Sequence, residues 1–415
     1  MNNREPIKDQ DIERLLERGV AEIIVEEELR GMLKSGRKLR LKEGFDPSAP
    51  DIHIGYMATL RKLRQFQELG HQVVLIIADW TAQIGDPSGM SATRQMLTAE
   101  QVRANAQTYM DQFFMVVDRD KTEIRWQNEW FGNFDLSDVI QLTSRFTVAQ
   151  FLAREDFSNR YNTGKPITIT ELLYPLLQAY DSVAIKADVE FGGLDQKFNF
   201  LVGRELQSMM GQPPQQCFMT PLLIGTDGSK KMSQSLGNYI GVAEPPEEIY
   251  GKVMSIPDTL IMDYFELLTD VSDDELADFR QALSDNTINP MNLKKRLAGE
   301  IVIQLHDEKV AARAEEHFAS VIQRKEVPDE IQEHYISFSA LTARQSGKAY
   351  IDISRLLVVT GLAESRTEAN RLISQGGTVI ADEVITSRLA PAETFQSGTI
   401  IKVGKRRFAK VINTD

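Results

Sequence analysis

The chain reads Gly44-Phe45-Asp46-Pro47-Ser48-Ala49-Pro50-Asp51-Ile52-His53-Ile54-Gly55-Tyr56 at the turn that decides its fold. A short strand-like segment at Arg40–Lys42 precedes this turn, and a helical pattern follows it from Tyr56 to Leu69. A second strand-like run, Val73–Ile77, comes directly afterwards. Strand, tight turn, helix and strand make the first crossover of a parallel sheet, and ligands of such sheets bind at the carboxyl ends of the strands. The stretch therefore predicts a parallel α/β domain with a binding site beside this turn.

His53 and Gly55 fall at the N-terminus of the predicted helix, where free backbone N–H groups and the helix dipole favour an anion. Gly55 has no side chain, so a flat ring could approach the backbone there. The simpler interpretation is that His53 only caps the helix and Gly55 only packs. The motif alone supports both interpretations about equally.

Composition and cysteine content indicate the class of protein. A chain of 415 residues with 42% hydrophobic and 26% charged residues is typical of a globular protein with two or three domains. The single cysteine, Cys217, excludes an internal disulfide and a cysteine metal cluster, and it fits a reducing cytosol. The sequence shows neither an apolar signal core at its start nor a run near the ~20 apolar residues of a membrane span. We therefore expect a cytoplasmic protein that meets no membrane.

The net charge of −13 is unevenly spread along the chain. Residues 348–415 contain ten Lys and Arg against seven Asp and Glu, a net of +3, so the remainder carries −16. A basic tail on an acidic body predicts a separate module that meets an anionic partner, although solvated surfaces often reach a charge of this size.

The segments around the first crossover are mostly helical by pattern. Residues 9–36 read as two amphipathic helices. Residues 78–89 contain too many Gly and Pro for a helix or strand. Asp86 of this loop would lie at the mouth of the same cleft as His53, although an Asp before Pro is often only a turn former. Residues 98–185 are mostly helical and predict a long insertion between strands, of the kind that carries partner contacts.

A polar stripe marks the helix pattern at Glu171–Asp181. Tyr174, Gln178 and Asp181 stand at positions i, i+4 and i+7, so they share one face of that helix. A phenol, an amide and a carboxylate make a poor core stripe, because each would need a buried partner. The spacing therefore favours a polar wall for a small ligand.

Two further segments bring polar groups toward the same edge of the sheet. A strand pattern at residues 187–191 ends in Gly192-Gly193-Leu194-Asp195-Gln196, where Asp195 can accept from ribose hydroxyls and Gln196 can bridge polar groups. Residues 225–235, Gly-Thr-Asp-Gly-Ser-Lys-Lys-Met-Ser-Gln-Ser, place two adjacent cations among small residues. Such a loop suits a flap that closes over phosphates. Taken alone, it is more typical of a solvated lysine turn.

Together these motifs resemble a class I aminoacyl-tRNA synthetase, and more closely a bacterial tyrosyl-tRNA synthetase. The resemblance covers nearly the whole chain and rests on Gly-Phe-Asp-Pro-Ser at 44–48, Gly-Asp-Pro-Ser-Gly at 85–89 and Tyr-Pro-Leu-Leu-Gln-Ala-Tyr-Asp at 174–181. It implies a tyrosine–tRNA ligase, in which the tyrosine carboxylate attacks the α-phosphate of ATP and a tRNA hydroxyl then takes the tyrosyl group. Positioning and donors aimed at the phosphates would carry catalysis. Mg2+ would arrive with ATP, without a protein-bound metal or prosthetic group.

The resemblance also implies roles for individual residues. The catalytic groups would be His53, Lys231 and Arg94. ATP would be bound by the turn, the ribose loop and the flap, through Ser48, His53, Gly55, Tyr56, Gly193, Asp195, Lys231 and Ser235. Tyrosine would be bound at its amino group, phenol and carboxylate by Asp86, Tyr174, Gln178, Asp181 and Gln196. An acceptor for the phenol, Asp181, would reject phenylalanine because that carboxylate would be left buried and unpaired.

Four positions depart from the family pattern: Tyr56 stands for His, Gln234 for Lys, Met90 for Lys or Arg, and Leu194 for Ser or Thr. Losing the cations at Met90 and Gln234 would raise the activation barrier by roughly 3–6 kcal/mol, if the two act independently. Two rival functions follow. One is a catalytically weakened paralogue that binds tyrosine or RNA, and the other is an aminoacyl-adenylate enzyme of a biosynthetic pathway.

The C-terminal residues read as a small mixed module. A helix pattern covers 351–360, a capping box at 365–368 opens a second helix, and strand patterns follow at 378–380 and 399–403. This module resembles the small RNA-binding domain that bacterial tyrosyl-tRNA synthetases share with a ribosomal protein. Its RNA-binding cations would be Arg355, Arg366, Arg371, Lys405, Arg406 and Arg407. A solubilising or dimer-contacting domain is the alternative.

The predicted organisation has four parts. A doubly wound, Rossmann-like catalytic domain covers 1–243, with its helical insertion at about 98–185. An α-helical anticodon-side domain covers 244–330, a linker 331–347, and the α+β RNA-binding domain 348–415. The resemblance implies a homodimer formed through the insertion, with tRNA(Tyr), tyrosine and ATP as partners.

Overall fold

The computed structural model describes residues 9–48, 51–88, 96–323, 331–345, 348–381, 383–404 and 407–415. The chain forms two compact units, residues 1–311 and 312–415. Within the described ranges, no helix is both long and apolar enough to cross a membrane.

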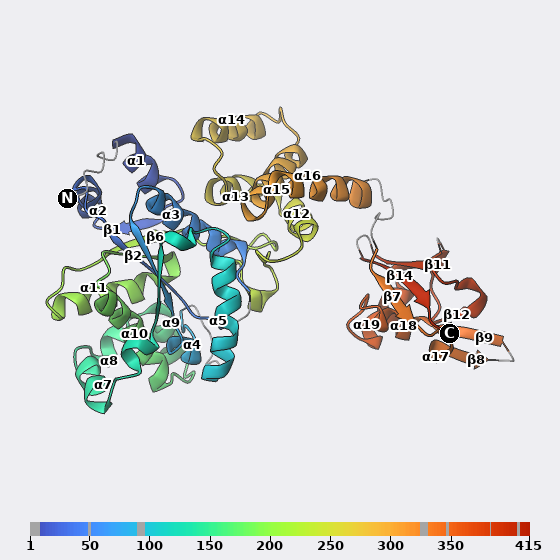
Figure 1. The fold of residues 1–415 in the computed structure, drawn as a ribbon, viewed down its shortest axis with the longest axis horizontal. Helices are drawn as coiled ribbons and strands as arrows, with labels where there is room; N and C mark the ends of the chain where they lie inside the picture. The colour runs from blue at the N-terminus through green and yellow to red at the C-terminus, as the bar shows by residue number, and fades with distance from the viewer. Residues whose placement is uncertain are drawn as a thin grey trace. The chain divides into compact units, whose positions relative to one another are not determined.

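The first unit is built on a six-stranded sheet with the order β1-β6-β5-β2-β3-β4 (Figure 1). Its strands are β1 (Glu22–Ile24), β2 (Arg40–Phe45), β3 (Gln72–Ile77), β4 (Thr122–Trp126), β5 (Val189–Gly193) and β6 (Gln216–Thr220). β2 pairs in parallel with both β3 and β5, and β4 and β6 continue the parallel sheet on the two sides. The chain therefore winds from β2 first in one direction and then in the other. This confirms the doubly wound prediction and creates a crevice at the carboxyl ends of β2 and β5.

Helices precede, connect and follow these strands (Figure 1). They are α1 (Asp9–Glu17), α2 (Glu26–Lys34), α3 (Met57–Glu68), α4 (Thr81–Ile84), α5 (Ala99–Phe113), α6 (Asn128–Phe131), α7 (Leu136–Thr143), α8 (Val148–Leu152), α9 (Glu155–Asn162), α10 (Ile169–Ile185), α11 (Lys197–Met209), α12 (Pro246–Met254), α13 (Ile261–Leu268), α14 (Asp273–Ser284), α15 (Pro290–Leu305) and α16 (Glu308–His317). A 3-10 turn, η1 (Ile54–Tyr56), leads into α3.

Helices α3 and α10 lie on opposite faces of the sheet. Phe66 of α3 contacts Phe191 of β5, with ring centroids 5.1 Å apart. The preceding strand residue, Glu190, instead bonds to Gln178 and Ser182 of α10. Because successive strand residues point to opposite faces, the two helices cover different sides of the sheet. The turn that starts α3 and the polar wall of α10 therefore approach the crevice from opposite sides.

Three strand segments differ from the sequence prediction. Residues 22–24, predicted as helix, form β1, which pairs antiparallel with β6. β4 lies within the 98–185 range predicted as helical, and Gly44 and Phe45 extend β2 into the predicted turn. β1 and β4 are edge strands whose residues are all partly exposed, so they lack the apolar run of a buried strand.

The second unit contains two sheets, with the orders β11-β10-β13-β14-β7 and β12-β9-β8. Its strands are β7 (Glu333–Ile336), β8 (Thr342–Gln345), β9 (Lys348–Asp352), β10 (Thr378–Ile380), β11 (Glu383–Ile385), β12 (Leu389–Pro391), β13 (Thr399–Val403) and β14 (Arg407–Asn413). Its helices are α17 (Phe338–Leu341), α18 (Ile353–Val359) and α19 (Arg366–Ser374). Both sheets and helices share one apolar core.

The predicted helices and strands of this module are confirmed, but its predicted start is wrong. α18, α19, β10 and β13 match the patterns, and Ser365 caps α19 by accepting from the backbone N–H of Glu368 at 3.2 Å. The segment 331–347, predicted as a linker, contains β7 and β8. β7 pairs in parallel with β14, which lies at the far end of the module. Because β14 lies far from β7 in the sequence, no pattern near the short segment 333–336 predicts this pairing.

Candidate functional site

The turn after β2 is held in place by backbone pairing with a distant segment. The N–H of Ile54 donates to the carbonyl of Ile240 at 2.8 Å, and the N–H of Val242 donates to the carbonyl of Ile52 at 2.9 Å. Gln112 of α5 also accepts from the N–H of Ile52. These contacts fix the point at which η1 and α3 begin, and they join the turn to the segment that follows the predicted flap.

His53 does not cap the helix that it precedes. Its side chain makes no cap hydrogen bond, and its Nδ1 is buried with no hydrogen-bond partner among the described residues. A Cβ on Gly55 would lie 2.8 Å from this Nδ1, so a side chain there would displace the ring. Burial and the charge of Lys231 lower the pKa of His53 to about 4. The capping interpretation is therefore wrong, and the neutral ring offers one donor and one acceptor.

Tyr56 keeps a hydrogen-bond donor where the family pattern has histidine. Its ring lies against that of His53, with centroids 4.6 Å apart. Desolvation of its hydroxyl, reinforced by the nearby carboxylates of Asp195, Asp46 and Asp86, raises the pKa of Tyr56 to about 12, although the residue is 40% exposed overall. The phenol therefore stays protonated and can donate to an anion throughout the physiological range.

The predicted polar wall of α10 is present, and each of its groups meets a different partner. Tyr174 donates from its hydroxyl to Asp46 Oδ2 at 2.9 Å. Gln178 donates from Nε2 to Glu190 Oε1 at 3.1 Å, which leaves Gln178 Oε1 buried and without a partner among the described residues. A buried acceptor in this state is unfavourable, and an ammonium group on a ligand would satisfy it.

Asp181 ends the polar wall and already accepts two hydrogen bonds. Gln127 donates from Nε2 at 2.8 Å and Trp130 from Nε1 at 3.1 Å. Burial raises the pKa of Asp181 to about 7, against the lowering effects of Lys42 and the two N–H donors. An ionised carboxylate has about four acceptor positions, so Asp181 can accept from one more donor.

Asp86 and Gln196, which come from different loops, are in direct contact. Gln196 donates from Nε2 to Asp86 Oδ2 at 2.7 Å, and the backbone N–H of Ser88 donates to Asp86 Oδ1 at 2.8 Å. Asn199 donates from Nδ2 to Gln196 Oε1 at 3.0 Å and so fixes the orientation of that amide. The side chain of Asp86 thus belongs to the site rather than serving only as a turn former.

The predicted flap lies against the ribose loop and the first turn. Lys231 donates from Nζ to Asp195 Oδ2 at 2.9 Å. Gln234, which stands where the family pattern has lysine, donates to the backbone carbonyl of Asp51. Ser235 contacts the hydroxyl of Ser233 at 2.9 Å. Gln234 therefore joins the flap to the turn instead of offering a cation.

The structure brings most of the predicted residues together, and it adds others. Ser48 lies on the turn, its N–H donating to the carbonyl of Asp46 at 2.7 Å, and a Cβ on Gly193 would lie 2.8 Å from Asp195. Arg94 and Met90 lie outside the described residues.

Sequence reasoning missed the residues that hold the polar wall, namely Lys42, Asp46, Gln127, Trp130 and Glu190. Only Asp46, inside the first motif, carried a signal that could have identified it.

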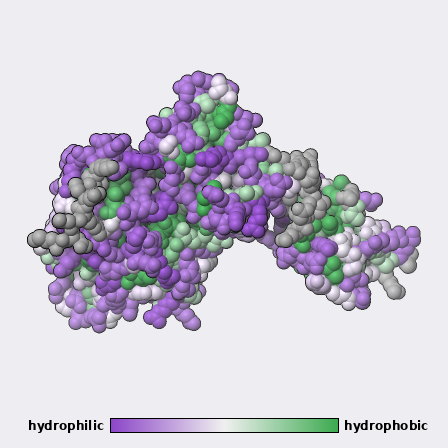
Figure 2. Space-filling model, turned by 45° about the horizontal axis from the view of Figure 1, so that its top comes forward, coloured by the Kyte–Doolittle hydropathy of each residue, from purple (hydrophilic) through white to green (hydrophobic). Residues whose placement is uncertain are grey.

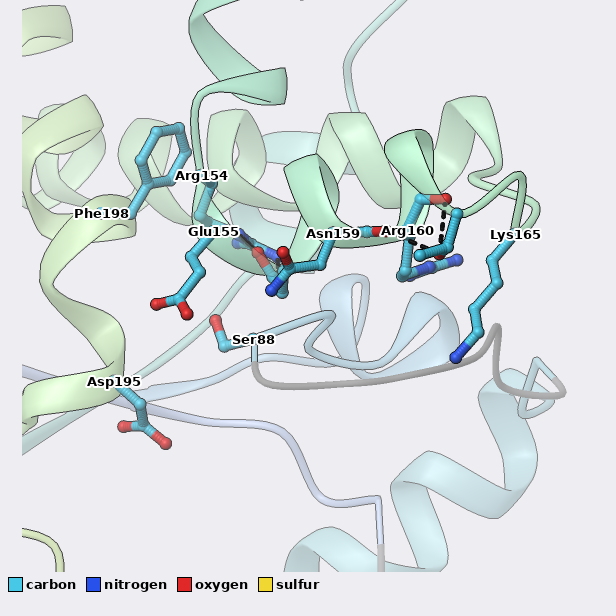
Figure 3. Close-up of a pocket in the computed structure, with 10 residues that line it drawn as sticks. Ser88, Arg154, Glu155, Asn159, Arg160, Lys165, Asp195 and Phe198 are labelled. Carbon is cyan, nitrogen blue, oxygen red and sulfur yellow. Dashed lines mark hydrogen bonds and ion pairs between the residues drawn. The ribbon is translucent and has the colours of Figure 1, made fainter.

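A pocket of about 530 Å³ opens beside the site, with Ser88 and Asp195 in its lining (Figure 3). Figure 3 shows Glu155 and Asn159 of α9 facing Ser88 across the opening. The pocket is lined by loops, by α9 and by Phe198 of α11, whereas the polar wall is formed by α10. It therefore adjoins the site at Ser88 and Asp195 and does not include the polar wall.

In the second unit, a carboxylate holds two arginines side by side. Asp352 Oδ2 accepts from Arg366 at 2.9 Å and from Arg388 at 2.8 Å, and both arginine side chains remain about half exposed. Burial would raise the pKa of Asp352, but hydrogen bonds from Arg388, from Ser354 and from the backbone N–H of Arg355 lower it to about 2. Sequence reasoning missed Arg388.

The other predicted cations differ in their surroundings. Arg355 and Arg371 are exposed, and Arg407 donates to the carbonyl of Leu362 at 2.7 Å. Lys405 and Arg406 lie outside the described residues.

Comparisons with known proteins agree on one family. Residues 34–323 match the model of the family described as tRNA synthetases class I (W and Y). A tyrosine–tRNA ligase of Dehalococcoides mccartyi (strain CBDB1) is 59% identical over 404 residues, covering 97% of this chain and 99% of that protein. A tyrosine–tRNA ligase of Thermotoga maritima is 49% identical over 398 residues, covering 96% of each.

Solved structures with the same fold include two tyrosyl-tRNA synthetases. A C-terminally truncated mitochondrial enzyme from Aspergillus nidulans matches with a TM-score of 0.62 at 20% identity, covering 75% of this chain and 93% of that one. An enzyme from Archaeoglobus fulgidus, complexed with L-tyrosine, matches with a TM-score of 0.59 at 24% identity, covering 74% of this chain and 98% of that one. At these identities the likeness concerns the fold alone.

Proposed function

The chain belongs to the class I tRNA synthetase family (W and Y), and on that premise we propose that it attaches tyrosine to tRNA(Tyr) at the expense of ATP. The observation that carries the choice of amino acid is the polar wall of α10. Gln178 Oε1, a buried acceptor that has no partner in the part of the chain that the structure describes, suits an ammonium group, and Asp181 retains room for one more donor. A phenol would supply that donor, whereas phenylalanine would not.

We place the substrate tyrosine along this wall. Its ammonium group would bind to Gln178 Oε1, with Tyr174 and Asp86 nearby, and its phenol hydroxyl would donate to Asp181. Gln196, whose amide is fixed by Asn199, would meet the carboxylate end. This arrangement would hold the carboxylate toward the crevice, where the first turn and the flap meet.

ATP would bind where the turn, the ribose loop and the flap converge. Neutral His53 and the protonated phenol of Tyr56 would donate to its phosphates, and Lys231 would leave Asp195 for them. Asp195 would then be available to the ribose hydroxyls. Mg2+ would arrive with ATP and neutralise part of the phosphate charge.

The proposed reaction has two steps. The tyrosine carboxylate attacks the α-phosphorus and pyrophosphate leaves, which gives tyrosyl-adenylate. A ribose hydroxyl at the 3′ end of tRNA then attacks the acyl carbon and AMP leaves. Donors that are already in position would stabilise the charge that develops on the phosphate in the first step. The high identity to tyrosine–tRNA ligases, together with the donor kept at Tyr56, supports an active enzyme over the weakened paralogue, although Gln234 supplies no cation.

We also propose that the chain acts as a homodimer in the cytoplasm. Five apolar side chains of the helical insertion are more than half exposed: Leu136, Ile140, Val148, Tyr161 and Ile169. On the face shown in Figure 2 the surface is mostly hydrophilic, with smaller hydrophobic areas between. Exposed apolar groups that recur along one segment favour an interaction surface. The arginine pair of the second unit would meet the tRNA backbone.

The test is tyrosine-dependent exchange of pyrophosphate into ATP, followed by charging of tRNA(Tyr). Replacement Lys231→Ala should reduce exchange by ~100-fold, because a charge-assisted contact to the reacting phosphates is lost. Tyrosine binding by calorimetry should stay unchanged, and the exposed-site control Lys121→Ala should retain full exchange. Wild-type protein that binds tyrosine but supports no exchange would favour the weakened paralogue. Failure to bind tyrosine would exclude the proposed function and would leave only a paralogue that binds RNA.

A further inference from the structure

A buried ion pair lies beneath the polar wall of α10. Lys42 of β2 is 1% exposed, Glu190 of β5 is 2% exposed, and Lys42 Nζ lies 2.8 Å from Glu190 Oε1. Removing two charges from water is unfavourable, and a hydrophobic pair of similar volume is often at least as stable. Stability alone therefore does not account for this pair.

All three donor positions of Lys42 are used, and two of them hold α10. Nζ donates to the backbone carbonyl of Gln178 at 2.7 Å and to the hydroxyl of Ser182 at 2.8 Å, in addition to Glu190. Gln178 and Ser182 flank Asp181 within one helical turn. Lys42 thus attaches the segment that carries the polar wall to the central strand of the sheet.

Glu190 fixes the orientation of an amide in that wall. Its Oε1 accepts from Gln178 Nε2 at 3.1 Å, while its Oε2 is occupied by Gln215 Nε2 and Ser182. Because Gln178 points its NH₂ group at Glu190, its Oε1 is the end left without a partner among the described residues. If the amide were reversed, Gln178 Oε1 would face Glu190 Oε1. Both atoms only accept when the carboxylate is ionised, so this hydrogen bond would be lost.

We propose that Lys42 and Glu190 are positioning residues for amino-acid recognition, acting through Gln178 and the α10 turn that carries Asp181. The inference rests on the proposed function, because it assumes that the wall binds tyrosine. The pair presents Gln178 as an acceptor to the substrate ammonium group and holds Asp181 at the phenol. Apart from burial, which raises the pKa of Asp181, the positive charge of Lys42 lowers it and the negative charge of Glu190 raises it, so the pair acts on Asp181 through its position rather than through its charge.

The main test is the double replacement Lys42→Met/Glu190→Met, which removes both charges and leaves no unpaired buried ion. The dissociation constant for tyrosine, measured by calorimetry, should rise by ~10–100-fold, and the preference for tyrosine over phenylalanine in exchange should fall by at least ~10-fold. The KM for ATP should change by less than about twofold, because neither residue of the pair is among the proposed ATP contacts.

A matched control lies on the same helix. Arg160 and Glu171 form a buried ion pair at the first turn of α10, with side chains 2% and 6% exposed and N–O separation 2.6 Å. The replacement Arg160→Met/Glu171→Met should change thermal stability without weakening tyrosine binding.

Unchanged tyrosine affinity and unchanged preference over phenylalanine in the folded double variant would overturn the inference. If that variant does not fold, the variant Ser182→Ala tests the inference instead. It removes one partner from Lys42 and from Glu190, and it should weaken tyrosine binding by ~3–10-fold with the KM for ATP unaltered. No effect of Ser182→Ala would then overturn the inference. Wild-type protein that binds no tyrosine would instead contradict the proposed function.

Discussion

Asp181 makes tyrosine recognition sensitive to pH. The ionised carboxylate accepts from the phenol, whereas the protonated form must place its own proton among the donors of Gln127 and Trp130. Because burial raises the pKa of Asp181 to about 7, a ligand that prefers the ionised form binds more tightly as pH rises through that value. Below it, the KM for tyrosine should increase by up to ~10-fold per pH unit. The measurement is exchange at saturating ATP between pH 5.5 and 8.5.

Two other residues of the candidate site cannot cause this pH dependence. His53, with a pKa lowered to about 4, and Tyr56, with a pKa raised to about 12, keep one protonation state over that whole interval. The variant Asp181→Asn should therefore show a flat profile and a reduced preference for tyrosine over phenylalanine. A wild-type profile without the acidic limb would contradict the role given to Asp181.

At the scale of elements, Arg61 joins α3 to α13. It is 4% exposed, and its guanidinium donates to the carbonyl of Leu267 at 2.7 Å and to the carboxylate of Asp270. α3 begins at the His53 turn, so the contact links the start of the active-site helix to the helical region that follows. Replacement Arg61→Ala should lower the free energy of unfolding by ~2–4 kcal/mol, because charge-assisted bonds to a buried group are lost.

The measurement for Arg61 is chemical denaturation of the full chain. The comparison is Arg280→Ala, which breaks an exposed ion pair with Glu266 and should change the free energy of unfolding by less than about 1 kcal/mol. Equal effects of the two replacements would mean that Arg61 is not a structural connection between these elements.

At the scale of the whole molecule, the helical insertion determines the oligomeric state in our proposal. The double replacement Leu136→Asp/Ile140→Asp places two charges on exposed apolar positions of α7 and should convert a dimer into a monomer. Light scattering after size-exclusion chromatography gives the mass. Val384→Asp, at another exposed apolar position, should leave the dimer intact. A dimer that survives the double replacement would place the interface elsewhere.

The second unit should affect tRNA binding and leave activation of tyrosine unchanged. Replacing Arg366 and Arg388 by Ala removes the two guanidinium groups that Asp352 holds together. The affinity for tRNA should fall and the slope of log K against log salt should decrease by ~1–2, as expected for one or two lost phosphate contacts. Exchange should remain at the wild-type rate. An unchanged salt slope would mean that these arginines do not meet the RNA backbone.

The sequence by itself determined the elements whose pattern is local. The first turn, with a strand before it and a helix after it, was readable because strands and helices have different side-chain periods. The spacing of Tyr174, Gln178 and Asp181 placed them on one helix face for the same reason. The capping box at Ser365 likewise marked the start of α19. The parallel sheet and the polar face of α10 follow from such signals, whereas the roles of most site residues were implied by the family resemblance.

Only the tertiary structure decided which distant groups meet. Lys42 bonds to Gln178 across 136 positions of sequence, and no spacing rule relates them. The edge strands β1 and β4, and the strand β7 inside the predicted linker, depend on partners supplied by other segments. Protonation and amide orientation are non-local for the same reason: burial and neighbouring charges, which the fold assembles, set the pKa of Asp181 and the direction in which Gln178 points.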